Sequence, residues 1–168
     1  QLDASGNAVI TAAQINNATT DNCDAASSMT FALNKTNFDC SNIGDNVVTL
    51  TVTDSKGNTQ TKSVTVKVED KVAPVVQVQN YTVQLDASGS ANITTANINN
   101  GSTDNCGIKS ISLDKTSFDC SNLGANTVTL TVEDVNGNTS SKTATVTVED
   151  KIAPVISVNE NFTAQLDA

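Results

Sequence analysis

The chain has 168 residues, a net charge of −9, few aromatic side chains and no histidine. An acidic surface repels the phosphates of nucleic acids and the headgroups of anionic lipids, so we expect no nucleic-acid partner. No apolar run approaches the roughly 20 residues that a membrane-spanning helix needs, so we expect no membrane insertion in this segment.

Internal repetition is the dominant feature of the sequence. The tetrapeptide Gln-Leu-Asp-Ala stands at Gln1–Ala4, Gln84–Ala87 and Gln165–Ala168. This period of about 80 residues is typical of tandem domains and is much longer than that of a β-solenoid. We therefore expect the sequence to be a window from a longer array. Two cysteine motifs recur in the same phase, at Asp21–Cys23 and Asp104–Cys106 and at Phe38–Asn42 and Phe118–Asn122.

The repeats define the expected domains. These are an N-terminal repeat (residues 1–70), a C-terminal repeat (residues 71–150) and the first strands of a third repeat (residues 151–168). The N-terminal repeat lacks the first strand that the second copy has. Each boundary has the sequence Glu-Asp-Lys-x-Ala-Pro, ending at Pro74 or Pro154. Proline fixes its own φ and holds the preceding residue extended, and no glycine-rich spacer flanks it, so we expect short, stiff joints.

The first part of each repeat predicts short elements. An Asp-Ala-Ser-Gly turn joins two brief strands. The polar segment that follows, residues 11–17 or 94–100, is compatible with one helical turn or with a loop. A strand with alternating apolar residues comes next, and then Phe38 or Phe118 leads to the second cysteine of the repeat.

The clearest secondary-structure signal is a pair of long alternating segments in each repeat. They flank an Asp-x-x-Gly-Asn sequence, residues 54–58 or 134–138. Period-two alternation around such a turn predicts a β-hairpin with one buried and one exposed face. The apolar positions are Val48, Leu50, Val52, Val64, Val66 and Val68 in the first repeat and Val128, Leu130, Val132, Ala144, Val146 and Val148 in the second.

Many short strands, with turns about every 8 to 12 residues, predict an all-β fold. We expect tandem Ig-like antiparallel β-sandwich modules of about seven strands each. The chain contains no tryptophan, so its modules are not of the antibody type, in which a buried tryptophan packs on the disulfide.

The four cysteines come as one pair per repeat. This pattern favours one intramodule disulfide per module, with Cys23 paired to Cys40 and Cys106 paired to Cys120. Each bridge would add roughly 3 kcal/mol of stability on the chain-entropy model. Disulfides also imply an oxidising, extracellular setting. The alternative is that all four cysteines are free, buried thiols.

Acidic residues recur beside the joints and in the turns, which suggests calcium as a bound cofactor. Calcium takes about six to eight oxygen ligands, and the end of one module with the loops of the next could supply them. The alternative is that these acids only stabilise turns. No Cys-x-x-Cys spacing indicates zinc. The candidate calcium ligands are Asp54, Glu69, Asp70, Asp86, Asp134, Glu149, Asp150 and Asp167.

Catalysis is not expected. Without histidine, a general base would have to be a carboxylate or a lysine. The most prominent acidic pair, Glu69 and Asp70, returns at the next joint as Glu149 and Asp150, which suits a structural role better than an active site. Rows of threonine on the exposed hairpin face would suit a ligand-binding surface, but the strand propensity of threonine alone accounts for them.

The hairpin with its Asp-x-x-Gly-Asn turn, followed by Glu-Asp-x-x-Ala-Pro-Val, resembles hyalin-repeat and related Ig-like modules. The two cysteine motifs together with Val-Thr-Val-Glu-Asp-Lys-x-Ala-Pro-Val are similar to tandem repeats of giant cell-surface adhesins of Bacteroidetes, including gliding-motility adhesins. The resemblance covers both copies. One departure is that many such modules have a further cysteine in the last strand, where this chain has Lys62-Ser-Val and Lys142-Thr-Ala.

The resemblance implies a secreted filamentous adhesin on the bacterial cell surface, in which these repeats form a structural stalk and contribute to surface adhesion and gliding. The expected partners are neighbouring repeats of the same chain, with surface polysaccharide bound through another region. Two alternatives remain open at this stage. The repeats could bind a glycan or surface directly, or they could be an accessory module of a secreted enzyme.

Overall fold

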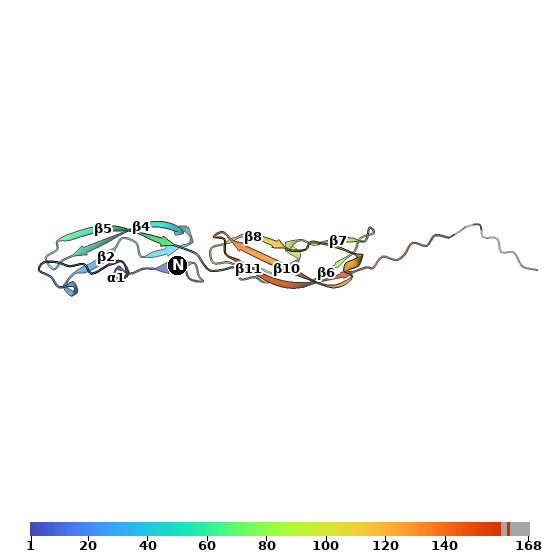
Figure 1. The fold of residues 1–168 in the computed structure, drawn as a ribbon, viewed down its shortest axis with the longest axis horizontal. Helices are drawn as coiled ribbons and strands as arrows, with labels where there is room; N and C mark the ends of the chain where they lie inside the picture. The colour runs from blue at the N-terminus through green and yellow to red at the C-terminus, as the bar shows by residue number, and fades with distance from the viewer. Residues whose placement is uncertain (159–160, 162–168) are drawn as a thin grey trace, which may run out of the picture.

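A computed structural model describes residues 1–158 and residue 161 of the chain. The two repeats lie end to end in an elongated molecule, and residues 151–158 extend away from the far end of the C-terminal repeat (Figure 1). The fold is mostly β, as the sequence predicts, with several small sheets and very short helices. No helix among the described residues has the length and apolar character needed to cross a membrane.

The N-terminal repeat contains five strands among its described residues. Residues 11–17 contain one helical turn, α1, rather than a loop, and the C-terminal repeat has the same turn as α2. The elements are β1 (Asn7–Val9), α1 (Ala12–Ile15), the 3₁₀ helix η1 (Ala26–Ser28), β2 (Thr30–Leu33), β3 (Asn37–Asp39), η2 (Cys40–Asn42), β4 (Gly44–Thr53) and β5 (Thr59–Val68).

The C-terminal repeat follows the same order and adds one strand, β6, at its start. Its described residues contain six strands. The elements are β6 (Tyr81–Gln84), β7 (Ser90–Asn92), α2 (Thr95–Ile98), β8 (Ile108–Leu113), β9 (Ser117–Asp119), the 3₁₀ helix η3 (Cys120–Asn122), β10 (Gly124–Asp134) and β11 (Thr139–Glu149).

Each repeat is built from two sheets. The larger sheet of the C-terminal repeat has the order β6-β11-β10-β8, and its smaller sheet pairs β7 with β9. The N-terminal repeat has the order β2-β4-β5 and a pair β1-β3. All these pairs are antiparallel except β6 with β11, which is parallel. The long hairpins β4-β5 and β10-β11 confirm the prediction from period-two alternation.

The strand number differs from the expected seven in each repeat. The N-terminal repeat has no counterpart of β6 among its described residues. In the C-terminal repeat the segment after Pro74 is held by two isolated bridges, Val75 with Thr103 and Val78 with Asn99, and forms no continuous strand.

The hydrophobic cores lie between the two sheets of each repeat and differ in size. The inward positions of β10 and β11 supply most of the larger core, because alternate residues of a strand face the same side. Its buried residues are Leu85, Ala91, Ile93, Ile98, Phe118, Val128, Leu130, Val132, Ala144, Val146 and Val148. The smaller, N-terminal core has the buried residues Leu2, Phe38, Val48 and Val68.

Candidate metal centre at the joint between the repeats

The joint between the repeats is closed by a disulfide. Cys40, at the start of η2 in the N-terminal repeat, is bonded to Cys106 in a loop of the C-terminal repeat. The two residues are separated by 66 positions in the sequence, and their Cα atoms lie 5.4 Å apart. The bridge therefore links the two repeats covalently at the point where they meet.

This pairing corrects the expected intramodule disulfides. Cys23 is not bonded to Cys40, nor Cys106 to Cys120, and Cys23 and Cys120 are exposed free thiols. The reason is geometric. Within one repeat the two cysteines lie at opposite ends of the long hairpin, and an 11-residue strand such as β10 spans about 35 Å. Cys40, at the joint end of the N-terminal repeat, consequently lies closer to Cys106 of the next repeat than to Cys23 of its own repeat.

The backbone fits closely around the bridge at Gly6. This residue has a positive φ of 75°. A Cβ atom there would lie 2.8 Å from Cys40 Sγ, which is shorter than real contacts allow, and 3.0 Å from the carbonyl oxygen of Asn105, which is a tight contact. Glycine is thus required for both its conformation and its lack of a side chain where the two repeats touch.

Asp70 lies at the centre of the joint, two residues after the end of β5. Only 7% of its surface is exposed. Its carboxylate accepts hydrogen bonds from Nδ2 of Asn105 at 3.2 Å and Nδ2 of Asn136 at 2.9 Å, both in the C-terminal repeat. It also accepts one from the amide of Val72 at 3.0 Å. These bonds hold the carboxylate in place without neutralising its charge.

Asp134, the last residue of β10, is completely buried. Its Oδ1 atom accepts hydrogen bonds from the amides of Asn136 and Asn138, and its Oδ2 atom accepts one from Nδ2 of Asn138 at 2.7 Å. Burial alone would raise the pKa of this carboxyl, but the bonds from Asn138 and Asn136 outweigh burial and hold the pKa below its ordinary value. Asn138 Nδ2 also lies 3.3 Å from the carbonyl oxygens of Asp70 and Val72, which ties the hairpin turn to the joint.

Asp104 is the third acid, in the loop that carries Cys106. Its Oδ1 atom accepts hydrogen bonds from the amides of Cys106 and Gly107, each at 2.9 Å. Its Oδ2 atom is buried and has no hydrogen-bond partner in the protein, and the same is true of Oδ1 of Asn105. A buried oxygen without a donor is costly, so both atoms are available to a bound cation.

The three carboxylates form one cluster. Oxygen atoms of Asp70, Asp104 and Asp134, one from each, all lie within 4.8 Å of one another. Two full charges 4 Å apart repel by about 4 kcal/mol at an effective dielectric constant of 20, and somewhat less at slightly larger separations. None of the four ion pairs among the described residues includes any of these acids. A cation that prefers oxygen ligands would relieve the repulsion and satisfy the orphaned oxygens.

Two of the eight predicted ligands, Asp70 and Asp134, lie in this cluster. The other predicted ligands that fall within the described residues lie outside it. Glu69 forms ion pairs with Lys67 and Lys71, both at 3.1 Å, which hold the pKa of its carboxyl below the usual range. Glu149 is paired with Lys151 at 2.7 Å.

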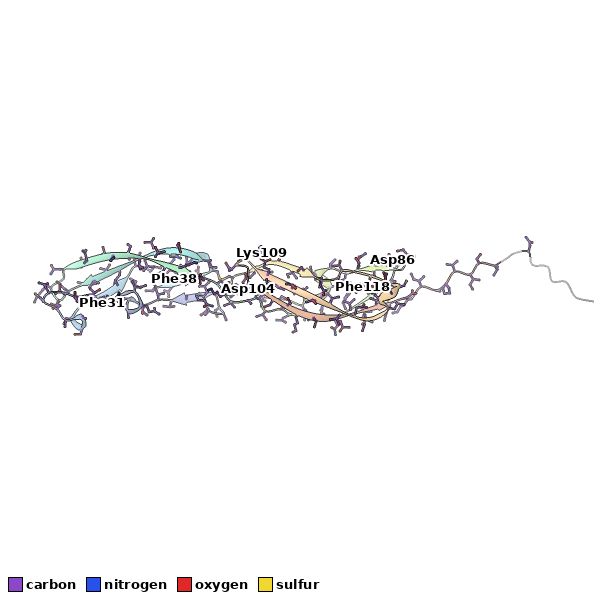
Figure 2. The ribbon with its side chains drawn as sticks, viewed as in Figure 1. Phe31, Phe38, Asp86, Asp104, Lys109 and Phe118 are labelled. Carbon is purple, nitrogen blue, oxygen red and sulfur yellow. A yellow bond between two sulfur atoms is a disulfide. The ribbon has the colours of Figure 1, made fainter. Side chains whose placement is uncertain are left out.

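The remaining candidates serve as acceptors in turns. Asp54 accepts from the amides of Lys56 and Asn58, and Asp86 accepts from the amides of Ser88 and Ser90. Asp86 lies at the end of the C-terminal repeat away from the joint, whereas Asp104 lies at the joint (Figure 2). Asp150 accepts from the amide of Ile152, as Asp70 does from Val72. Asp167 lies outside the described residues.

Asp104 was missing from the predicted ligands. The sequence carried a usable signal, because an aspartate stands two residues before the first cysteine of both repeats, at positions 21 and 104. That signal points to the joint only when the disulfide partner of Cys106 is known. Once Cys106 is bonded across the joint, the neighbouring Asp104 must also lie there.

No model of a known protein family matches the chain, and no curated protein has a similar sequence.

Proposed function

We propose that the chain is a stiff stalk segment of a secreted, filamentous cell-surface adhesin, and that its repeats are Ig-like β-sandwich modules. The observation that carries this proposal is the joint. A disulfide and hydrogen bonds from Asn105 and Asn136 connect the two repeats in the region where the chain passes through a linker of a few residues. Such a joint resists bending and pulling, which is the mechanical requirement of a stalk.

A bound calcium ion completes the joint in this proposal. Asp70 comes from the N-terminal repeat, and Asp104 and Asp134 come from the C-terminal repeat, so one ion would hold both sides. Three hard carboxylate ligands, with further carbonyl and amide oxygens nearby, suit calcium rather than a thiolate-binding metal. The ion would supply charge neutralisation, while the chain's own asparagines keep the three carboxylates in place.

Calcium-dependent melting tests the metal centre. We expect excess calcium to raise the melting temperature relative to chelator, by an amount equivalent to about 2.7 kcal/mol at a free concentration of 100 times Kd. Asp104→Asn should abolish this response, because it removes the ligand with the unpartnered oxygen. Asp21→Asn is the matched control, since Asp21 holds the same position in the N-terminal repeat, away from the joint. Identical melting of the unmodified chain in calcium and in chelator would refute the calcium centre.

Solution scattering tests the stalk. The oxidised chain in calcium should scatter X-rays as a rigid, elongated particle. Cys40→Ser in chelator should scatter as two bodies with variable orientation, because both cross-links of the joint are then lost. Flexible scattering from the oxidised chain in calcium would contradict a stalk role. Direct binding of the chain to surface polysaccharide would instead favour the alternative of a binding module.

A further inference from the structure

The disulfide and the acidic cluster at the joint share one short loop. Cys106 is bonded to Cys40, and Asp104, two residues before Cys106, supplies one of the three carboxylates. The amides of Cys106 and Gly107 each donate a hydrogen bond to Asp104 Oδ1 at 2.9 Å. The same few residues therefore fix the position of the bridge and the direction of the Asp104 carboxylate.

Asn105 stands between Asp104 and Cys106 and contacts the N-terminal repeat. Its Nδ2 atom donates to Asp70 Oδ1 and to the carbonyl oxygen of Asp3, both at 3.2 Å. Its own carbonyl oxygen lies 3.4 Å from Cys40 Sγ. The loop is thus held against the N-terminal repeat by one covalent bond and by individual hydrogen bonds around it.

The three carboxylates of the cluster come from the two sides of the joint. Asp104 and Asp134 both belong to the C-terminal repeat, which positions them through its own loop and the end of β10. Asp70 follows β5 of the N-terminal repeat and completes the cluster from the other side. The bridge therefore holds a third carboxylate against a half-site of two carboxylates that the C-terminal repeat forms by itself.

Small solutes can reach both parts of the joint. Asp70, Asn136 and Asn138 are among the residues that line a hollow of about 440 Å³ between the repeats. Cys40 and Cys106 are both partly exposed. An ion can consequently enter and leave the centre while the bridge is intact, and a small dithiol can reach the bridge.

We infer that the bridge between Cys40 and Cys106 controls the affinity of the joint for calcium, an inference that rests on the proposed calcium centre. In the oxidised chain the ion meets three carboxylates that are already in place. After reduction the linker and the hydrogen bonds remain, so calcium binding must also order the joint, and this ordering lowers the affinity. Calcium in turn favours the oxidised joint, because the coupling between two sites is reciprocal.

The redox step needs a reductant, for which a small dithiol such as dithiothreitol suffices. The dithiol loses two electrons and two protons and becomes a cyclic disulfide. The sulfur–sulfur bond between Cys40 and Cys106 breaks, and each sulfur takes up one electron and one proton to become a thiol. Oxidation by a small-molecule disulfide runs the same exchange in the opposite direction.

This coupling makes stiffening of the joint depend on the compartment. Thiols stay reduced in the cytosol and form disulfides in oxidising, extracytoplasmic surroundings. In a reducing compartment the joint would bind calcium weakly and bend. In an oxidising one the bridge forms, and the same calcium concentration then fills the centre and fixes the angle between the repeats.

Calcium titration by calorimetry of the oxidised and the dithiothreitol-reduced chain tests the inference. Both samples carry Cys23→Ser and Cys120→Ser, which replace the two free thiols and leave the bridge as the group that reacts. We expect reduction to raise the Kd for calcium about tenfold or more, within the range of typical coupling between sites. Circular dichroism should show that the strands survive reduction, since each repeat has its own core.

The variant Asp70→Asn separates loss of the third carboxylate from loss of folding. In the oxidised chain it should raise the Kd to about that of the reduced chain, and reduction should then change little further, because the charge that the bridge presents is already absent. Asp150→Asn is the matched control and should keep the tenfold effect. Asp150 accepts a hydrogen bond from the amide of Ile152, as Asp70 does from Val72, but it lies at the other end of the C-terminal repeat.

The reciprocal effect gives a second readout. In a buffer of reduced and oxidised dithiothreitol, saturating calcium should favour the bridged form by the same factor, and a tenfold change corresponds to about 30 mV for this two-electron couple. Mass spectrometry after trapping of the thiols measures the bridged fraction.

Three outcomes would overturn the inference, and they differ in what else they exclude. Equal calcium affinity of the oxidised and reduced chains removes the redox control and leaves the calcium centre intact. An equally large effect of reduction on Asp70→Asn shows that reduction acts through general unfolding. Absence of calcium binding to the oxidised chain excludes the calcium centre itself and this inference with it.

Discussion

The two repeats have nearly the same hairpin sequence and bury it to different degrees. In the C-terminal repeat Ala144, Val146 and Val148 of β11 are all buried. In the N-terminal repeat β5 buries only Val68, and Val64 is exposed. The difference arises outside the hairpin, because β11 is covered by β6 and the segment before it, whereas β5 has no such neighbour in the part of the chain that the structure describes. Alternation thus decides which side chains face inward, and a neighbouring segment decides whether they are buried.

Residues at the joint also differ from their counterparts at the outer ends of the two repeats. Asp134 at the joint is fully buried, while its counterpart Asp54 at the outer end of the N-terminal repeat is partly exposed. Cys40 is bonded and Cys120 is free. Each repeat therefore carries both halves of a joint, one at each end, and among the described residues these halves are buried and bonded where they meet.

Removing the bridge should have the largest effect. We expect Cys40→Ser to lower the free energy of unfolding by up to about 4 kcal/mol, because the bridge closes a loop of 66 residues that spans parts of both repeats. Cys120→Ser changes the matching cysteine and should have almost no effect, since that thiol is free. Urea unfolding followed by circular dichroism measures both variants. Equal destabilisation by the two substitutions would show that the pairing differs from Cys40–Cys106.

The difference in burial between the two cores predicts a smaller loss of stability than removal of the disulfide. Leu130→Ala should cost about 3 kcal/mol, because Leu130 is completely buried and its removal leaves a cavity. Leu50→Ala should cost about half as much, since Leu50 lines a groove beside β4 and β5 that is open to solvent, and solvent can fill the space. Urea unfolding followed by circular dichroism measures both variants, and the fluorescence of Tyr81, the single tyrosine, reports unfolding of the C-terminal repeat in particular. If both variants lost the same stability, the groove would not be open in solution.

These contrasts show how far the sequence could predict the structure. The hairpins were predictable because alternation and the Asp-x-x-Gly-Asn turn are local signals. The partners of Cys40 and Cys106 were not, because pairing depends on which ends of two repeats face each other, and no local pattern carries that information. Asp104 was missed for the same reason. Asp70 and Asp134 were among the predicted ligands because both stand beside a repeat boundary or a hairpin turn.

The expected number of strands was wrong for a related reason. The segment after Pro74 has the apolar residues of a strand, Val76 and Val78, and they do pack on the core. Its backbone makes isolated bridges to the loop after α2 rather than a continuous ladder. Composition predicts burial of such a segment but does not predict how many of its backbone groups pair.

The smallest effect comes from one pair of residues in which the repeats differ in charge. Asp114 accepts a hydrogen bond from the amide of Thr129 at 2.8 Å, and Asn34 accepts the same bond from Thr49 at 2.8 Å. The bond from Thr129 holds the pKa of Asp114 below its ordinary value, although burial opposes this. A lowered folded-state pKa means stability that is complete above the unfolded pKa of about 3.9 and is lost as pH falls through the folded value.

We therefore expect Asp114→Asn to destabilise the C-terminal repeat by a few tenths of a kcal/mol at pH 6, since a neutral acceptor replaces a charged one at an exposed site. The difference from the unmodified chain should shrink as the pH falls below about 4, where the carboxylate also becomes neutral. Tyr81 fluorescence during urea unfolding at each pH measures this difference in stability. The reciprocal change Asn34→Asp should give the N-terminal repeat the pH dependence that it lacks at this position. A constant difference between Asp114→Asn and the unmodified chain from pH 6 to pH 3 would mean that the charge of Asp114 contributes nothing to the bond with Thr129, and that the two repeats are equivalent here despite their sequences.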